Sequence, residues 1–184
     1  MAFLRPDIVT LQEVPFRLSH ELTNFVRAFL PGYEIASGSG TDGFIRSAIL
    51  SRHPIRRSQK WLDGVPLNEF GVDARFTRDL FEAEIQLPGG GEPVHVFTTH
   101  LKALSDAPSA QRRAAEARAI SNFFATVFLP AWAHRPYVLT GDLNEDVDRP
   151  PSSRRRPLQH LVNDGTGLRL LTPGDPVTGG ERTF

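Results

Sequence analysis

The feature that most constrains the fold is a set of three apolar segments that each end in polar side chains. These segments are residues 8–13, 94–100 and 138–144. Short apolar runs closed by turn-forming residues are typical of buried β-strands. The polar residues at their C-terminal ends are Glu13, His100, Asp142 and Asn144. We therefore expect strand ends to present an acid, an imidazole and an Asp-x-Asn pair to a common edge.

Length and composition indicate one ordinary globular domain spanning residues 1–184. A chain of this size can bury roughly 70% of its unfolded surface. Lys+Arg and Asp+Glu balance at 21 each, so net charge gives no argument for a polyanionic partner. The absence of cysteine excludes disulfides and thiolate metal sites. No run approaches the ~20 apolar residues of a membrane span, and no signal peptide is seen, so the cellular location stays open.

Strand and helix patterns alternate along the chain. Helices are expected at residues 19–30, 109–128 and 157–163, the second with Arg113 on its outer face. Strands are expected at 7–12, 44–50, 55–62, 76–87, 93–99, 136–141 and 167–171. Hairpins mixed with crossover helices favour an α/β fold of packed sheets covered by helices, in place of a wound parallel sheet.

The glycine-rich segment 38–43 satisfies the dinucleotide-binding pattern literally. That pattern must open a helix, because the phosphates bind at the helix N-terminus. Residues 44–50 read as a strand instead. We therefore expect segment 38–43 to be a hairpin loop.

Asp142 and Asn144 are the strongest candidate site residues. Alternation along a strand points both side chains to one face and turns Leu143 into the core, while Gly141 allows a close approach of backbone or substrate. Two polar side chains there are costly unless they are hydrogen-bonded or exposed in a cleft. The alternative is an Asx turn that begins the following loop.

Glu13 and His100 become candidates because they occur together with Asp142 and Asn144 at the ends of predicted strands. An acid at a strand end is most often a solvated residue, and a single histidine there is usually structural. A hard cation such as Mg²⁺ nevertheless needs only one or two carboxylates. An imidazole near it can bind a phosphate oxygen and stabilise developing charge.

Four ordered motifs resemble the endonuclease/exonuclease/phosphatase superfamily, typified by deoxyribonuclease I. They are Leu11-Gln12-Glu13, Ile49-Leu50-Ser51-Arg52-His53-Pro54-Ile55, Thr99-His100-Leu101 and Gly141-Asp142-Leu143-Asn144. The resemblance covers nearly the whole chain and is specific for the superfamily, although it specifies no substrate.

The resemblance implies a four-layer α/β/β/α sandwich of two packed mixed sheets flanked by helices. It implies divalent-metal-dependent hydrolysis of phosphate esters by a phosphodiesterase, nuclease or phosphatase. Glu13 would bind Mg²⁺ or Mn²⁺, and Asp142 would orient or deprotonate the attacking water. Asn144 would hold the nucleophile or phosphate, His100 would contact the scissile phosphate, and Arg78 resembles an arginine near the substrate.

Compared with the family pattern, the sandwich is expected to be incomplete at its N- and C-terminal strands. The family has an Asn-bearing strand before the segment of Glu13 and an Asp-His motif after the last segment of this chain. Loss of one acid–base group typically costs ~10²–10⁴ in rate. We therefore expect weak or no hydrolysis by this chain alone.

Two other interpretations stay open. The chain is a non-catalytic binding module or degenerate domain that retains the sandwich, or a partial chain that completes its sheets with another polypeptide. Within the enzyme interpretation the partner is a phosphate ester: nucleic acid, a phospholipid or sphingolipid head group, or a small phosphoester.

Overall fold

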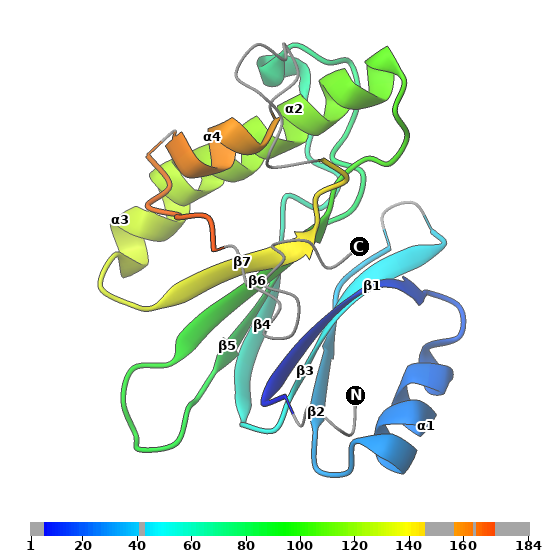
Figure 1. Ribbon diagram of the computed structural model, residues 1–184, viewed down its shortest axis with the longest axis vertical. Coiled ribbons are helices and arrows are strands. Elements are labelled where there is room, and N and C mark those ends of the chain that lie inside the picture. The colour runs from blue at the N-terminus through cyan, green and yellow to red at the C-terminus, as the bar shows by residue number, and fades with distance from the viewer. Residues whose placement is uncertain (1–5, 41–42, 146–156, 164, 172–184) are drawn as a thin grey trace, which may run out of the picture.

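The computed structural model describes residues 6–40, 43–145, 157–163 and 165–171, and it contains two packed β-sheets (Figure 1). The first has the strand order β1-β3-β2 and is antiparallel. The second has the order β4-β5-β6-β7, antiparallel except for the parallel β6–β7 pair. The strands are β1 (Ile8–Pro15), β2 (Glu34–Ser37), β3 (Ile45–Ser51), β4 (Ile55–Trp61), β5 (Leu80–Ile85), β6 (Val94–His100) and β7 (Tyr137–Asp142).

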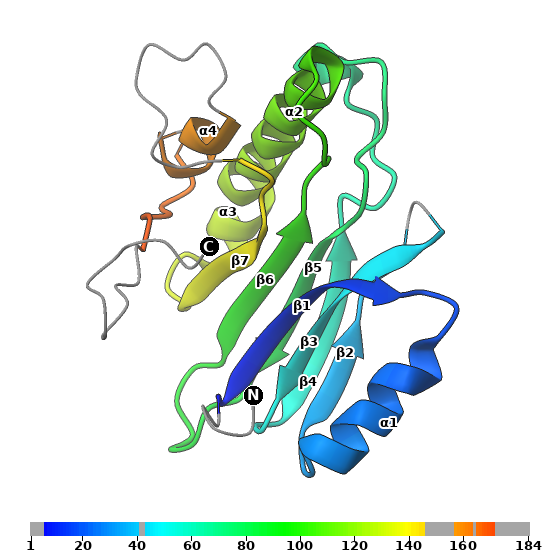
Figure 2. The ribbon, with the colours of Figure 1, turned by 45° about the vertical axis from the view of Figure 1, so that its right-hand side comes forward.

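Helices cover the outer face of each sheet (Figures 1 and 2). Helix α1 (Ser19–Phe29) lies on the three-stranded sheet, and α2 (Ala107–Phe123) lies on the four-stranded sheet. Helix α2 continues through a π-helical turn, η2 (Phe124–Phe128), into α3 (Leu129–Trp132). Helix α4 (Pro157–Asn163) packs on α2, and a short 3₁₀ helix, η1 (Asn68–Phe70), lies between β4 and β5. The expected order of layers, α/β/β/α, is confirmed.

Three hydrophobic clusters fill the three interfaces between these four layers. Ile49 and Phe81 belong to the cluster between the sheets, while Leu50 packs with Val26 beneath α1. Phe97 packs with the aromatic side chains of α2 and η2. Adjacent residues of β3 therefore enter different clusters, as the period-two geometry of a strand requires.

Strand boundaries agree with the sequence pattern to within a few residues, apart from two differences. Strand β2 was not expected, and residues 167–171 are irregular, so the strand predicted there is wrong. The glycine-rich segment connects the antiparallel strands β2 and β3, which confirms a hairpin loop; its residues 41–42 lie outside the described part. Gly165 and Gly167 have φ values of 74° and 69°, which interrupt extended backbone beside the predicted strand.

The expected outward orientation of Arg113 is also wrong. Its residue exposure is 3%, and its guanidinium lies 3.2 Å from the Glu145 carboxylate. A buried arginine is tolerated because charged and carbonyl oxygens surround it. Among the described residues, no helix combines the length and apolarity that a membrane span requires.

Candidate functional site

The parallel pairing of β6 and β7 places the expected site residues at one edge of the sheet. In this register His100 lies opposite Asp142, the last residue of each strand. The His100 Nε2 and Asp142 Oδ2 atoms are 3.9 Å apart. The His100 side chain is 2% exposed, whereas that of Asp142 is 53% exposed. A buried imidazole thus lies beside a carboxylate that reaches solvent.

Gly141 permits this close strand pairing. Its φ is 134°, and a Cβ atom built on it would lie 2.0 Å from the carbonyl oxygen of Thr99. Any other residue would push β7 away from β6 at the point where the site begins. The sequence-based expectation of a close backbone approach at this glycine is confirmed.

The Asp142–Asn144 segment forms the Asx turn that the sequence left open. The Asn144 backbone N–H donates to Asp142 Oδ1 at 2.9 Å, and Asn144 has a φ of 48°. Its side-chain Nδ2 donates to the carbonyl of Leu101 at 3.1 Å. Leu143 packs against the core beneath α2, as expected. The turn therefore fixes Asn144 beside the end of β6.

Arg78 supports the same strand end from beneath. Arg78 lies just before β5 and is only 8% exposed. Its Nη1 donates to the carbonyls of His100 and Leu101 at 3.1 and 3.3 Å. The structure thus brings Arg78, His100, Asp142 and Asn144 together around the end of β6.

Glu13 lies on the neighbouring sheet, in an irregularity of β1. The β1–β3 register shifts between Leu11 and Val14, and Glu13 is exposed with a φ of 58°. Gln12 donates to Thr98 Oγ1 at 2.8 Å, which places this part of β1 beside β6. Glu13 thus comes from the three-stranded sheet, whereas His100 and Asp142 lie at the end of the four-stranded sheet.

Two expected site residues, Glu13 and Asn144, have left-handed backbone conformations. Such a conformation is costly for Glu13, whereas asparagine adopts it more readily, and non-glycine residues in this conformation are often found at functional sites.

Within the described segments, no group of three or more His, Asp or Glu side chains is arranged to hold a metal ion. Mg²⁺ keeps several water ligands and binds proteins through one or two carboxylates. The exposed carboxylates of Glu13 and Asp142 provide that donor chemistry. The donor set therefore suits a sparsely ligated Mg²⁺ ion better than an enclosed metal centre.

Sequence reasoning missed a buried acid near this edge. Asp79 is fully buried, and its Oδ2 accepts the backbone N–H of Ser39 at 2.8 Å. Burial raises the pKa of the Asp79 carboxyl from an ordinary 3.8 to about 6, against the opposing effect of the Ser39 hydrogen bond. The sequence offered one indication of this burial: Asp79 directly precedes a strand rich in apolar residues, where a side chain has little access to water.

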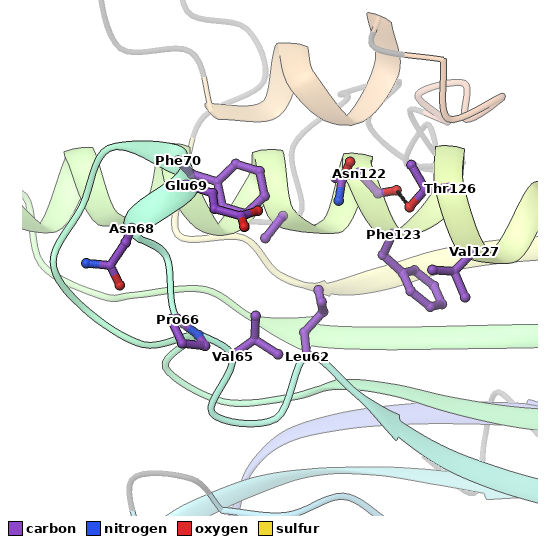
Figure 3. Close-up of a pocket in the computed structure, with 11 residues that line it drawn as sticks. Leu62, Val65, Pro66, Asn68, Glu69, Phe70, Asn122, Phe123, Thr126 and Val127 are labelled. Atoms are coloured by element: carbon purple, nitrogen blue, oxygen red, sulfur yellow. Dashed lines mark hydrogen bonds between the residues drawn. The ribbon is translucent and has the colours of Figure 1, made fainter.

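A hollow of about 380 Å³ lies elsewhere, between the β4–β5 connection and α2 (Figure 3). Leu62, Phe70 and Phe123 supply apolar surface, with Asn68 and Asn122 at its margin. None of the five expected site residues lines it. The hollow is therefore separate from the strand-end site.

Comparison with known proteins identifies the family of this chain. The sequence pattern that defines the endonuclease/exonuclease/phosphatase family matches residues 2–183. The chain belongs to this family. A comparison with curated proteins gives no match.

Solved structures share the endonuclease/exonuclease/phosphatase fold. Sphingomyelinase C from Streptomyces griseocarneus has a TM-score of 0.61 and 22% identity, covering 90% of this chain and 59% of its own. TDP2 from D. rerio, complexed with a single-strand DNA product, has a TM-score of 0.58 and 19% identity, and the match covers 89% of this chain and 54% of the TDP2 chain. The human Nocturnin catalytic domain with bound sulfate has a TM-score of 0.59 and 17% identity, and the match covers 77% of this chain and 53% of the Nocturnin chain. The chain thus spans about half the length of each structure.

Proposed function

We propose that this chain carries a phosphate-ester hydrolysis site at the ends of β6 and β7. The observation that carries the proposal is the parallel register that sets His100 opposite Asp142, with 3.9 Å between Nε2 and Oδ2. An imidazole beside a solvent-facing carboxylate can bind a phosphate oxygen while the acid orients water. Membership of the family makes this the expected reaction class.

Each expected residue has a role in this proposal. Glu13 holds Mg²⁺ or Mn²⁺, which supplies charge stabilisation when it is bound. Asp142 orients or deprotonates the attacking water, and its exposed side chain is accessible to that water. His100 contacts the scissile phosphate, and Asn144 holds the nucleophile or the phosphate.

Arg78 has a more limited role than direct substrate binding. Its guanidinium already donates to two carbonyls at the end of β6, and the residue is buried. We therefore assign it to supporting the His100 backbone, with its positive charge stabilising an anionic phosphate nearby.

The substrate belongs to one of three phosphate-ester classes: nucleic acid, lipid head group or small phosphoester. One structural neighbour holds a single-strand DNA product, and another is a sphingomyelinase. Assays of this chain against single-stranded DNA, sphingomyelin and inositol phosphates would separate these classes.

We also propose that turnover by this chain is low, because it spans about half of the solved structures that it resembles. Comparing this chain with a version extended at both ends to the full family pattern tests this point. Equal turnover by the two proteins would contradict it.

The role of Asp142 is tested by hydrolysis of bis(p-nitrophenyl) phosphate with Mg²⁺ present, in the version extended at both ends, where higher turnover leaves a measurable range. Asp142→Asn should lower kcat by ~10²–10⁴, because it removes a general base. Asp73→Asn replaces another exposed acid, located in the β4–β5 connection, and should retain wild-type activity. Identical rates for wild type and Asp142→Asn would refute the assigned role.

Metal binding is tested separately by calorimetric titration with Mn²⁺. Glu13→Gln should weaken binding at least tenfold, whereas Glu21→Gln on α1 should leave it unchanged. Binding of Mn²⁺ or phosphate esters without any turnover, also by the version extended at both ends, would favour the non-catalytic binding module.

A further inference from the structure

Helix α2 contains a buried acid that holds two segments next to the site. Glu116 is fully buried. Its Oε1 accepts the backbone N–H of Thr77 at 2.9 Å, and its Oε2 accepts the backbone N–H of Lys102 at 2.8 Å. Thr77 directly precedes Arg78, and Lys102 lies two residues after His100. One carboxylate therefore connects the approach to β5 with the exit from β6.

Arg113, one helical turn earlier, also contacts the exit from β6 and reaches one further segment. Its Nη1 donates to the carbonyl of Lys102 at 3.0 Å and also to that of Leu104. Its Nε donates to Glu145 Oε2 at 3.2 Å, and both side chains are at least 96% buried. Glu145 directly follows Asn144. The guanidinium thus joins the exit from β6 to the end of the Asp142–Asn144 turn.

We infer that Arg113 and Glu116 are positioning residues that set the relative placement of Arg78, His100 and Asn144. Their spacing of three places both side chains on the same face of α2. The inference rests on the proposed hydrolysis at this edge and extends it to a helix that carries none of the expected site residues.

The chemistry of the two side chains suits this task. A guanidinium presents five donors in a rigid fork, and a carboxylate accepts several hydrogen bonds at fixed angles. Burial raises the pKa of the Glu116 carboxyl, while the hydrogen bonds from Thr77 and Lys102 oppose that effect. A hydrophobic side chain would fill the same space without fixing any backbone group. Small displacements of catalytic groups have large effects on rate, so fixed backbone at this edge matters.

The Glu116→Gln variant tests the carboxylate. A glutamine amide presents one acceptor and one donor, so it cannot accept from Thr77 and Lys102 through both of its terminal atoms. In the version extended at both ends, we expect kcat for bis(p-nitrophenyl) phosphate to fall tenfold or more, with KM changed less than threefold. The thermal unfolding midpoint should stay within a few degrees of wild type, because the variant also removes a buried charge.

Arg118→Gln is the matched control on the same helix. Its guanidinium is exposed and contacts Phe70, on the side of the hollow and away from the strand ends. The control should retain wild-type kcat and KM. A loss of activity in Arg118→Gln equal to that in Glu116→Gln would show a general effect on α2 and overturn the inference.

The double variant Arg113→Met/Glu145→Gln separates positioning from stability. Removing Arg113 alone leaves the buried Glu145 carboxylate without its guanidinium, which destabilises the fold. Neutralising both partners restores stability but not the hydrogen bonds to Lys102 and Leu104. We expect a near-native unfolding midpoint with kcat still reduced tenfold or more. Recovery of both stability and kcat would overturn the positioning role.

NMR spectra distinguish failure of this inference from failure of the proposed function. Absence of hydrolytic activity in the version extended at both ends would refute the proposed function alone. The inference is then judged by backbone amide signals of His100, Leu101 and Asn144, which should shift in Glu116→Gln and in the double variant but not in Arg118→Gln. Unchanged signals in both positioning variants would overturn the inference whatever the activity.

Discussion

Strand β6 contains two histidines that each lie beside an acid, in opposite environments. His95 Nδ1 is 2.5 Å from Glu82 Oε1, and the two side chains are 0% and 1% exposed. Glu82 also accepts from Trp61 Nε1 at 2.7 Å, and the rings of Phe128 and Trp132 cover His95. His100, five residues later, lies 3.9 Å from a half-exposed Asp142.

The enclosed pair, His95–Glu82, and the rim pair, His100–Asp142, each join an imidazole and a carboxylate, but they differ in the separation of the two groups and in the access of the acid to solvent. The enclosed acid has partners for its charge, which include Arg57 at 3.1 Å. No substrate reaches it. The rim acid has one oxygen in a turn and another directed toward His100. Access to solvent, together with a fixed geometry, is what makes the rim pair suited to chemistry.

The largest expected effect on the free energy of unfolding comes from removing the acid of the enclosed pair. Glu82→Ala should lower the unfolding free energy by roughly 3–5 kcal/mol, because it leaves buried polar groups without their acid. Asp142→Ala should cost only about 1 kcal/mol, the value of a turn hydrogen bond. Urea denaturation of both variants measures the difference. Equal losses would remove the distinction between the two pairs.

A second prediction concerns Asp79, three residues before Glu82 and hydrogen-bonded to Ser39 instead of to a cation. Its pKa is raised to about 6 in the folded protein and is near 3.8 when unfolded. The folded state therefore binds the proton more tightly, and stability is lost as pH rises from about 4 to about 6. Above that window the loss amounts to about 3 kcal/mol.

Asp79→Asn removes this loss. Its unfolding free energy should exceed that of wild type by up to about 3 kcal/mol at pH 8, and the excess should vanish near pH 4. Asp73→Asn, an exposed control, should show no such dependence. Denaturant titrations at several pH values provide the measurement. A constant difference across pH would show that Asp79 is not titrating in this range.

The smallest expected effect concerns strain near the rim pair. Leu104 has a φ of 81° and is 66% exposed, and Arg113 donates to its carbonyl. Leu104→Gly should stabilise the protein by up to about 1 kcal/mol, because glycine adopts this conformation without steric cost. Leu87→Gly, at an exposed leucine without positive φ, should destabilise it slightly. Thermal unfolding of both variants tests the difference in sign.

Much of the sandwich could be predicted from local pattern. Strands β6 and β7 are apolar runs with clear ends, and Gly141 indicated the close approach that the structure contains. Strand β2 was missed because four residues give too little alternation to recognise. The strand expected at 167–171 has apolar residues, but adjacent left-handed glycines prevent extended pairing.

The site could be predicted only as a set of residue types. The sequence identified His100 and Asp142, but their facing positions depend on a register between strands 42 residues apart. Arg113 was placed outside because its helical position is next to polar residues; its burial depends on Glu145, 32 residues away. Pairings between residues so far apart produce no periodic pattern in the sequence, so they could not be predicted from it.

The Asx turn at Asp142 gives the two oxygens of one carboxylate different tasks. Oδ1 is anchored by the Asn144 amide, so the group cannot rotate freely about its Cβ–Cγ bond. Oδ2 then keeps a constant direction toward the imidazole and incoming solvent. An added methylene, as in Asp142→Glu, would preserve charge yet lose this anchor. The length of the side chain at this position therefore matters as much as its acidity.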